Sequence, residues 1–110
     1  MERQLAFQID RADNVCTVLA PVAPGTVHVT GESDQLTIQA LSEIPKGHKI
    51  ALRRIEEGRP VIKYGVEIGI ATRTIEPGEW VHLHNCRSRY DERSSTLDVI
   101  SGAPTDTPYL

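Results

Sequence analysis

The 110-residue sequence predicts a single all-β domain. Its apolar and β-branched runs are short and are separated by turn signals about every ten residues, which is typical of all-β chains. No segment has the sustained apolar period of a helix. In four turn-like segments an apolar residue is followed three positions later by glycine, and such a glycine suits the positive φ of a tight turn. These strand–turn–strand units are 22–25, 44–47, 55–58 and 75–78.

The first half of the chain contains four expected strands. Residues 4–9 alternate weakly between polar and apolar side chains, and a polar turn follows at 10–14. The next run is apolar and β-branched, which favours a strand, and Pro21 and Gly25 bound the turn after it. Further on, apolar and polar residues alternate on both sides of a polar loop at 30–34, as in half-buried strands. The last three strands of this half are expected at 15–20, 27–29 and 36–40.

The second half is expected to hold three more strands, at 50–52, 61–64 and 81–84. Residues 68–72 fit either a strand or a short helical turn. The segment 91–110 is rich in Ser, Thr, Asp and Pro and holds an apolar island at Leu97, Val99 and Ile100. We therefore expect a domain at 1–90 and a polar tail at 91–110, either mobile or docked on a partner, with an ordered extra strand as the alternative.

Composition excludes several classes of protein. The net charge is −3 and the pI is about 5.8, which argues against a nucleic-acid surface because phosphate binding needs a basic patch. The N-terminus has no apolar signal-peptide region, and no apolar run has transmembrane length. Cys16 and Cys86 form neither a CxxC motif nor a disulfide framework. We expect a cytoplasmic protein with reduced, structural thiols and no membrane partner.

The most unusual stretch is His82-Leu83-His84-Asn85. On an extended strand, His82 and His84 would share one face, and such a pair can ligate a metal. A third ligand would have to come from His48, from His28 or from a carboxylate elsewhere. The alternative is that both histidines are half-exposed at a strand end and only form hydrogen bonds.

A second histidine lies in the turn Lys46-Gly47-His48-Lys49. Neighbouring positive charge would lower the pKa of His48 and keep it neutral, so that it could act as a base or a hydrogen-bond donor. The alternative is an exposed turn residue. We expect this turn to lie beside the His82–His84 strand end, so that the three imidazoles share one edge of the domain.

Several motifs together resemble one family. The segments are Asp13-Asn14-Val15, Ile44-Pro45-Lys46-Gly47-His48-Lys49, Lys63-Tyr64-Gly65, Ile75-x-x-Gly78 and Val81-His82-x-His84-Asn85. In this order they resemble the SAF-type N-terminal domain of the altronate and galactarate dehydratases. They are also similar to the alpha subunit of sulfolactate sulfo-lyase. The resemblance covers residues 10–88, and the tail after Arg89 matches nothing in it.

The resemblance implies a β-clip fold of bent hairpins and a lyase that removes water from a sugar acid to give a 2-keto-3-deoxy acid. His48, His82 and His84 would be the catalytic residues. Lys49, Asn85, Asn14 and Lys63 would bind the anionic substrate. A divalent metal, iron or manganese, would be held mainly by a large dehydratase-like subunit, with His82 and His84 as candidate ligands.

Three functions remain open at this stage. The first is a small subunit of a sugar-acid hydro-lyase that is inactive without its large subunit. The second is a small subunit of a sulfolactate-type sulfo-lyase, or a non-catalytic SAF-like module for carbohydrate binding or assembly. The third is a small metalloprotein that uses the histidines alone. The leaving group and the oligomeric state, including a homo-oligomer, are not encoded in any residue that can be read here.

Overall fold

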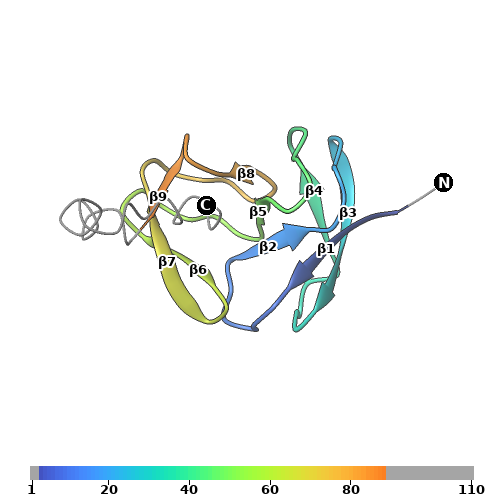
Figure 1. Ribbon diagram of the computed structural model, residues 1–110, viewed down its shortest axis with the longest axis horizontal. Helices are drawn as coiled ribbons and strands as arrows, with labels where there is room; N and C mark the ends of the chain where they lie inside the picture. The colour runs from blue at the N-terminus through green and yellow to red at the C-terminus, as the bar shows by residue number, and fades with distance from the viewer. Residues whose placement is uncertain (1–2, 89–110) are drawn as a thin grey trace, which may run out of the picture.

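The computed structural model describes residues 3–88, which form nine strands and no helix (Figure 1). The all-β prediction is confirmed. No helix in this part of the chain has the length and apolar character needed to cross a membrane. The strands are β1 (Gln4–Gln8), β2 (Val15–Val18), β3 (Gly25–Gly31), β4 (Thr37–Ala40), β5 (Lys49–Ala51), β6 (Pro60–Lys63), β7 (Val66–Ala71), β8 (Trp80–Val81) and β9 (Cys86–Ser88).

The strands form two curved sheets that lie side by side in Figure 1. The six-stranded sheet has the order β4-β3-β1-β2-β5-β8, and the three-stranded sheet has the order β6-β7-β9. The β1–β3 pair is parallel, and the other pairs are antiparallel. Two isolated bridges, Val22 to Ile44 and Ile55 to Ile75, join turns that lie outside the strands. Each bridge links two of the predicted apolar-x-x-Gly units.

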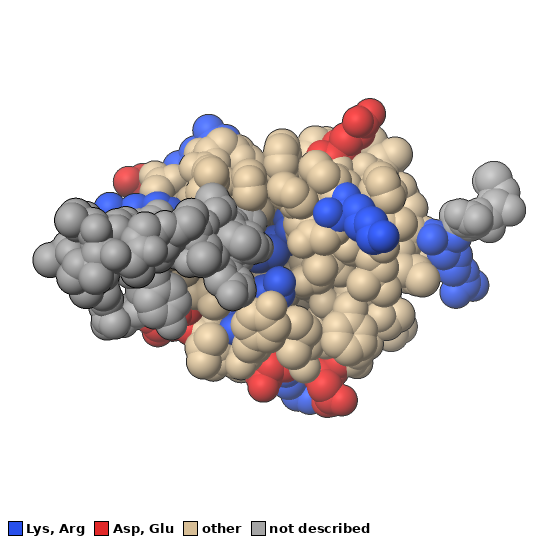
Figure 2. Space-filling view, in the orientation of Figure 1, with Lys and Arg blue, Asp and Glu red and all other residues tan. Residues whose placement is uncertain are grey.

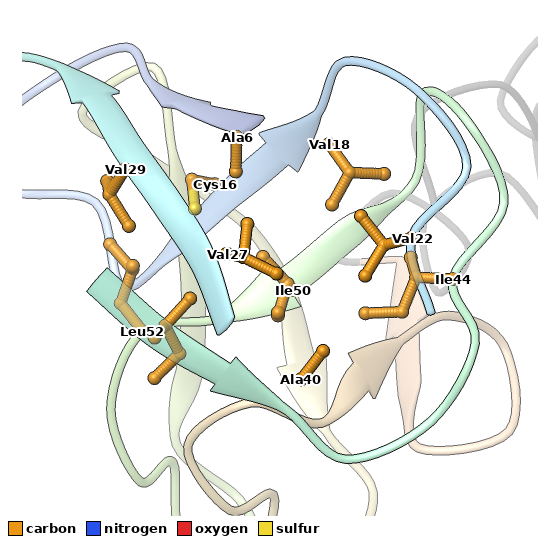
Figure 3. Packing of buried hydrophobic residues seen from close by; sticks show 11 residues of the cluster. Ala6, Cys16, Val18, Val22, Val27, Val29, Ala40, Ile44, Ile50 and Leu52 are labelled. Atoms are coloured by element: carbon orange, nitrogen blue, oxygen red, sulfur yellow. The ribbon is translucent and has the colours of Figure 1, made fainter. Parts of the chain in front are cut away.

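The larger sheet curls around its own hydrophobic core (Figure 3). Alternate residues of its strands point inward, so Val27 and Val29 are buried while His28, between them, is half-exposed. Trp80 packs against this core from β8. The buried members are Ala6, Cys16, Val18, Val22, Val27, Val29, Ile38, Ala40, Ile44, Ile50 and Leu52.

A second core joins the two sheets. Val15, Ala51 and Val81 belong to the larger sheet but pack into this second cluster. Because adjacent residues on a strand face opposite ways, Cys16 and Ile50 enter the first core while Val15 and Ala51 enter the second. From the smaller sheet and its turns come Ile55, Val61, Ile68, Ala71, Ile75 and Cys86. Strands β2, β5 and β8 are therefore the wall shared by both cores.

A polar clamp, formed by Asp13 and Asn14, fixes the β6–β7 hairpin to the larger sheet. The hairpin turn is Tyr64-Gly65, and both residues have positive φ (61° and 73°), as a two-residue type I′ turn requires. Asp13 is 1% exposed, and its carboxylate accepts the main-chain N–H groups of Tyr64 at 3.2 Å and Gly65 at 2.8 Å. Asn14 accepts from Ile62 N–H at 2.8 Å and donates to the Pro60 carbonyl at 3.0 Å.

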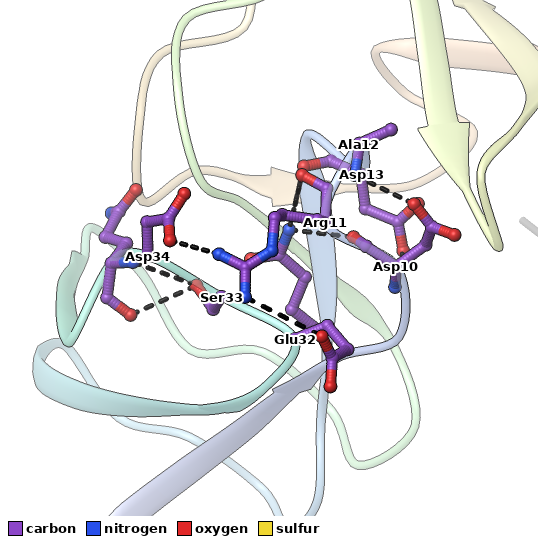
Figure 4. A network of polar contacts seen from close by, with 9 residues as sticks. Asp10, Arg11, Ala12, Asp13, Glu32, Ser33 and Asp34 are labelled. Atoms are coloured by element: carbon purple, nitrogen blue, oxygen red, sulfur yellow. Dashed lines mark hydrogen bonds and ion pairs between the residues drawn. The ribbon is translucent and has the colours of Figure 1, made fainter.

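Next to this clamp lies a solvent-exposed ionic cluster, seen in Figure 4. Asp13 also accepts the main-chain N–H of Asp10, which closes the turn after β1. From the same turn, Arg11 reaches out to pair with Glu32 and Asp34. These three charged side chains are largely exposed, so their ion pairs contribute little to stability compared with the buried Asp13 contacts.

The predicted strands agree with the structure up to β7, but strand β9 was not predicted. Residues 68–72, for which the sequence allowed a strand or a short helical turn, lie mostly in strand β7. The expected strand at 81–84 is wrong, because β8 ends at Val81 and residues 82–85 form a turn. The argument that His82 and His84 share a strand face therefore fails. The predicted tail at 91–110 lies outside the described residues.

Candidate functional site

Three histidines and one tryptophan form a ring cluster at the end of the β5–β8 pair. In this antiparallel pair Lys49 lies opposite Val81, which places His48, just before β5, across from His82, just after β8. The ring centroids of His48 and His82 are 4.6 Å apart. The two histidine-bearing segments thus meet at one edge, as the sequence predicted, and we call the four residues His48, Trp80, His82 and His84 the imidazole edge.

Trp80 is the centre of the imidazole edge. Its ring centroid lies 5.7 Å from those of His48 and His82 and 5.0 Å from that of His84. The rings of Trp80 and His82 are stacked, with only 6° between their planes. The indole Nε1–H donates a hydrogen bond of 3.2 Å to His48 Nδ1. Sequence reasoning missed this residue, although the only tryptophan of the chain, two positions before His82, was a usable signal.

The local environment favours neutral imidazoles. Burial, then the charge of His82, then that of Lys49 lower the pKa of His48. The predicted effect of the neighbouring lysine is therefore present, but burial is the larger cause. The pKa of His84 is also lowered, first by desolvation and then by Arg73, while Glu79 acts in the opposite direction. His82 is distinguished by a buried Nδ1 that has no hydrogen-bond partner within residues 3–88.

The turn that presents His82 and His84 is held by Asn85. This residue is fully buried, and its side-chain oxygen accepts the main-chain N–H of His82 at 3.0 Å. Its amide nitrogen donates to the Trp80 carbonyl at 2.8 Å. The Asn85 side chain is therefore engaged with the main chain of Trp80 and of His82. Its predicted contact with substrate is untested, and its visible role is to position the two histidines.

Two lysines bring positive charge toward the space between the sheets. Lys49 is 2% exposed, and burial followed by the charge of Lys63 lowers its pKa to about 8. Lys63 extends its ammonium group over the Tyr64 ring, 5.0 Å from the centroid. In Figure 2, lysine and arginine side chains lie both near the middle of the face and at its margins, and acidic ones lie mainly at the margins. The charges of Lys49 and Lys63, which act on each other, would attract an anion.

Two grooves lie close to these residues. One, of about 280 Å³, is lined by Pro21, Val22, Glu43, Ile44, Pro45 and Trp80, so it adjoins the imidazole edge. The other, of about 510 Å³, is lined by Asn14, Arg54, Ile55, Glu56, Arg59, Pro60 and Ile62. Asn14, predicted to bind substrate, reaches this second groove while its carboxamide holds β6. The structure therefore does not bring Asn14 into the imidazole edge.

Metal binding is the other role predicted for His82 and His84. Structural and catalytic metal sites commonly need three or more protein ligands. Within residues 3–88, no group of three or more His, Cys, Asp and Glu side chains is arranged to hold a metal ion. His82 and His84 would thus need donors from outside these residues to form a metal site. Cys16 and Cys86 are buried thiols, and burial, followed by the charge of Asp13, raises the pKa of Cys16 to about 12, as suits structural cysteines.

Comparison with known proteins identifies the family of this chain. The sequence model of the altronate/galactarate dehydratase SAF domain matches residues 4–89. An altronate dehydratase of Bacillus subtilis (strain 168) is 36% identical over 94% of this chain and 20% of its own length. An altronate dehydratase of Escherichia coli (strain K12) is 39% identical over 78% of this chain and 17% of its own length.

A much shorter protein is similar over nearly its whole length. The (2R)-sulfolactate sulfo-lyase subunit alpha of Paracoccus pantotrophus is 39% identical over 56% of this chain and 91% of its own length. The chain thus spans about a fifth of the altronate dehydratases but almost all of this subunit. On the match over residues 4–89, the chain belongs to the family of altronate/galactarate dehydratase SAF domains.

Proposed function

We propose that this chain is the SAF part of a sugar-acid hydro-lyase and works as a small subunit with a larger dehydratase-like chain. The proposed reaction removes water from a hydroxy acid such as altronate or galactarate and gives a 2-keto-3-deoxy acid. Relatives named altronate dehydratase support the reaction class. A relative named as an alpha subunit supports the idea that such a domain can be one subunit of a lyase.

The observation that carries the proposal is the approach of His48 and His82, at 4.6 Å between ring centroids, from segments far apart in the sequence. Elimination needs a base to remove the proton next to the carboxylate and an acid to assist the leaving hydroxyl group. An imidazole that is neutral near pH 7 can act as the base or as a hydrogen-bond donor, and the lowered pKa of His48 favours this state. The imidazole edge therefore offers proton carriers to a pocket completed by the larger chain.

Substrate binding and metal binding are divided between the two chains in this proposal. Lys49 and Lys63 attract the carboxylate of the substrate, and Asn14 and Asn85 position the elements around it. The larger chain holds the divalent metal, iron or manganese, which supplies Lewis-acid assistance when it is bound. His82 and His84 then belong to the metal site only if the larger chain adds the missing donors.

A second candidate is a subunit of a sulfo-lyase that releases sulfite from a sulfonated hydroxy acid. The match over 91% of a sulfolactate sulfo-lyase alpha subunit favours it. Both reactions break a bond at the carbon beside an acidified C–H, so the same imidazoles could serve either leaving group. The proposed roles of His48, His82 and His84 are the same in both cases.

The proposal is tested by reconstitution. The full chain is co-purified with the large dehydratase-like chain encoded beside it and assayed with altronate, galactarate and sulfolactate, following 2-keto-3-deoxy acid and sulfite. We expect no turnover by either chain alone and turnover by the mixture. His48→Gln and His82→Gln should each lower kcat at least about 100-fold, the range for lost acid–base groups.

His28→Gln is the matched control, because His28 lies on β3 and has no ring contact with the imidazole edge among the described residues. It should keep full activity. If the His48 and His82 variants assemble with the large chain and turn over at the wild-type rate, the imidazole edge is not the proton-transfer site. Sulfite release without keto-acid formation from sugar acids would favour the second candidate over the first.

A further inference from the structure

The hydrogen bond from Trp80 to His48 determines which nitrogen of the imidazole ring carries the proton. The indole N–H is a donor and has no acceptor capacity. It donates to His48 Nδ1 at 3.2 Å, so that nitrogen must carry a lone pair and no proton. A neutral imidazole has one proton, which must then be on Nε2. His48 is therefore described as a neutral imidazole with its single N–H at Nε2.

Trp80 is held firmly enough to impose this state. Its side chain is partly buried and packs against the first hydrophobic core, while its neighbour Val81 is buried in the second core. The Trp80 carbonyl also accepts from Asn85, which ties the strand end to the following turn. Rotation of the indole away from His48 would disrupt this packing. The donor is thus preorganised by the fold and does not depend on a bound ligand.

His82 differs from His48 although the rings are neighbours. Its Nδ1 is buried and has no hydrogen-bond partner, whereas the Nδ1 of His48 is occupied by Trp80. The groups that act on His48 are the ring of His82 at 4.6 Å and the charge of Lys49, the next residue along the chain. The Lys49 ammonium group has no lone pair, and the indole N–H makes its hydrogen bond to His48 Nδ1. The asymmetry between the two histidines therefore originates from Trp80.

We infer that Trp80 is a positioning residue that fixes the Nε2–H tautomer of His48, so that His48 presents a hydrogen-bond donor to an oxygen atom of the ligand. Given the proposed function, this oxygen belongs to a hydroxyl or carboxylate group of a hydroxy acid. His48 then acts as the hydrogen-bond donor of the pair. The tautomer itself is a property of the chain alone and does not depend on the proposed reaction.

The inference is tested by nuclear magnetic resonance on the full chain labelled with ¹⁵N in its histidine rings, near pH 7.5. In the wild-type protein, long-range proton–nitrogen spectra should show an unprotonated Nδ1 and a protonated Nε2 for His48. A protonated Nδ1 would overturn the inference. This first measurement needs no variant, so it decides the tautomer even if a substitution of Trp80 prevents folding.

The variant Trp80→Phe then tests the cause. Phenylalanine keeps an aromatic ring in contact with the histidines but removes the only N–H of the side chain. We expect the two nitrogen signals of His48 to move toward each other as both tautomers become populated, with those of His28 unchanged. An unchanged His48 tautomer in the folded variant would show that Trp80 does not set it.

The result separates this inference from the proposed function. If the tautomer is as expected but the reconstituted enzyme has no lyase activity, the positioning role of Trp80 stands and the reaction is wrong. If the enzyme is active but His48 carries its proton on Nδ1, the reaction stands and the positioning role is wrong. For an active enzyme, we expect Trp80→Phe to lower kcat about 10-fold or more with KM little changed, since positioning acts on the chemical step.

Discussion

The clamp of Asp13 and Asn14 and the imidazole edge are both polar, but their hydrogen bonding differs. In the clamp, the side-chain oxygens meet main-chain N–H groups of Asp10, Ile62, Tyr64 and Gly65, and no buried side-chain atom of the two residues lacks a partner. At the imidazole edge, rings contact rings, and the buried His82 Nδ1 has no hydrogen-bond partner. A fully satisfied polar cluster holds a fold together, whereas a partly satisfied one has capacity left for a ligand.

The largest effect should come from breaking the clamp. In Asp13→Ala the main-chain N–H groups of Tyr64 and Gly65 lose a charged acceptor, and each such bond contributes about 1.5–3 kcal/mol. We expect the free energy of unfolding to fall by about 4 kcal/mol in urea denaturation. Asp34→Ala, which removes an exposed ion pair of Arg11, should change it by less than about 1 kcal/mol. Equal losses in the two variants would show that the clamp is not a special structural element.

Lys49, which lies next to the imidazole edge, should give the strongest pH dependence. Its pKa falls from 10.5 to about 8 on folding, so the folded state disfavours the charged form. Stability should therefore rise as pH increases from about 8 to 10.5, by at most roughly 3 kcal/mol at about 1.4 kcal/mol per unit. The measurement is the free energy of unfolding across this range. Lys49→Met should remove the rise, and an equal rise in the variant would assign it to another group.

Substitution of Asn85 tests whether stability can be lost without a change at the imidazole edge. Asn85→Ala removes one acceptor for His82 N–H and one donor to the Trp80 carbonyl, which should cost about 2 kcal/mol of stability. Because the turn also positions the histidines, proton chemical shifts of the His82 and His84 rings should change, whereas those of His28 should not. A variant that loses stability with unchanged His82 and His84 signals would make Asn85 purely structural.

The smallest effect should come from the histidines at mildly acidic pH. Since the pKa values of His48 and His84 are lowered from 6.5 on folding, their contribution to stability is present above pH 6.5 and is lost as pH falls through the folded values. The difference in unfolding free energy between wild type and the double variant His48→Gln, His84→Gln should therefore shrink below pH 6.5. A difference that grows on acidification would mean that the folded protein prefers the charged imidazoles.

The sequence predicted the strands well because most of their information is local. Alternation around His28 and the glycine turns at Gly47 and Gly78 can be read directly from the chain. It failed at His82 and His84 because a turn held by the side chain of Asn85 overrode the period-two pattern. Local reading could not find Trp80 as the partner of His48 either, since that contact depends on the pairing of β5 with β8.

Roles that depend on long-range contacts were also incompletely predicted. Asp13 and Asn14 lie in the predicted polar turn at 10–14, but the targets of their side chains lie about fifty residues away on β6 and in the β6–β7 turn. Lys49 is buried between the sheets, although lysine is mostly exposed in proteins and no local pattern indicates otherwise. Both cases arise because the two hydrophobic cores share one wall of strands.

The most direct test of the imidazole edge is the distance between its two halves in solution. In the isolated full-length chain, nuclear Overhauser effects should connect the ring protons of His48 with those of His82, and both with Trp80. Contacts across the Val22–Ile44 bridge serve as the internal standard for a folded domain. The account predicts ring-to-ring contacts in every sample that shows this bridge. A folded chain with the bridge intact and no contact between His48 and His82 would contradict it.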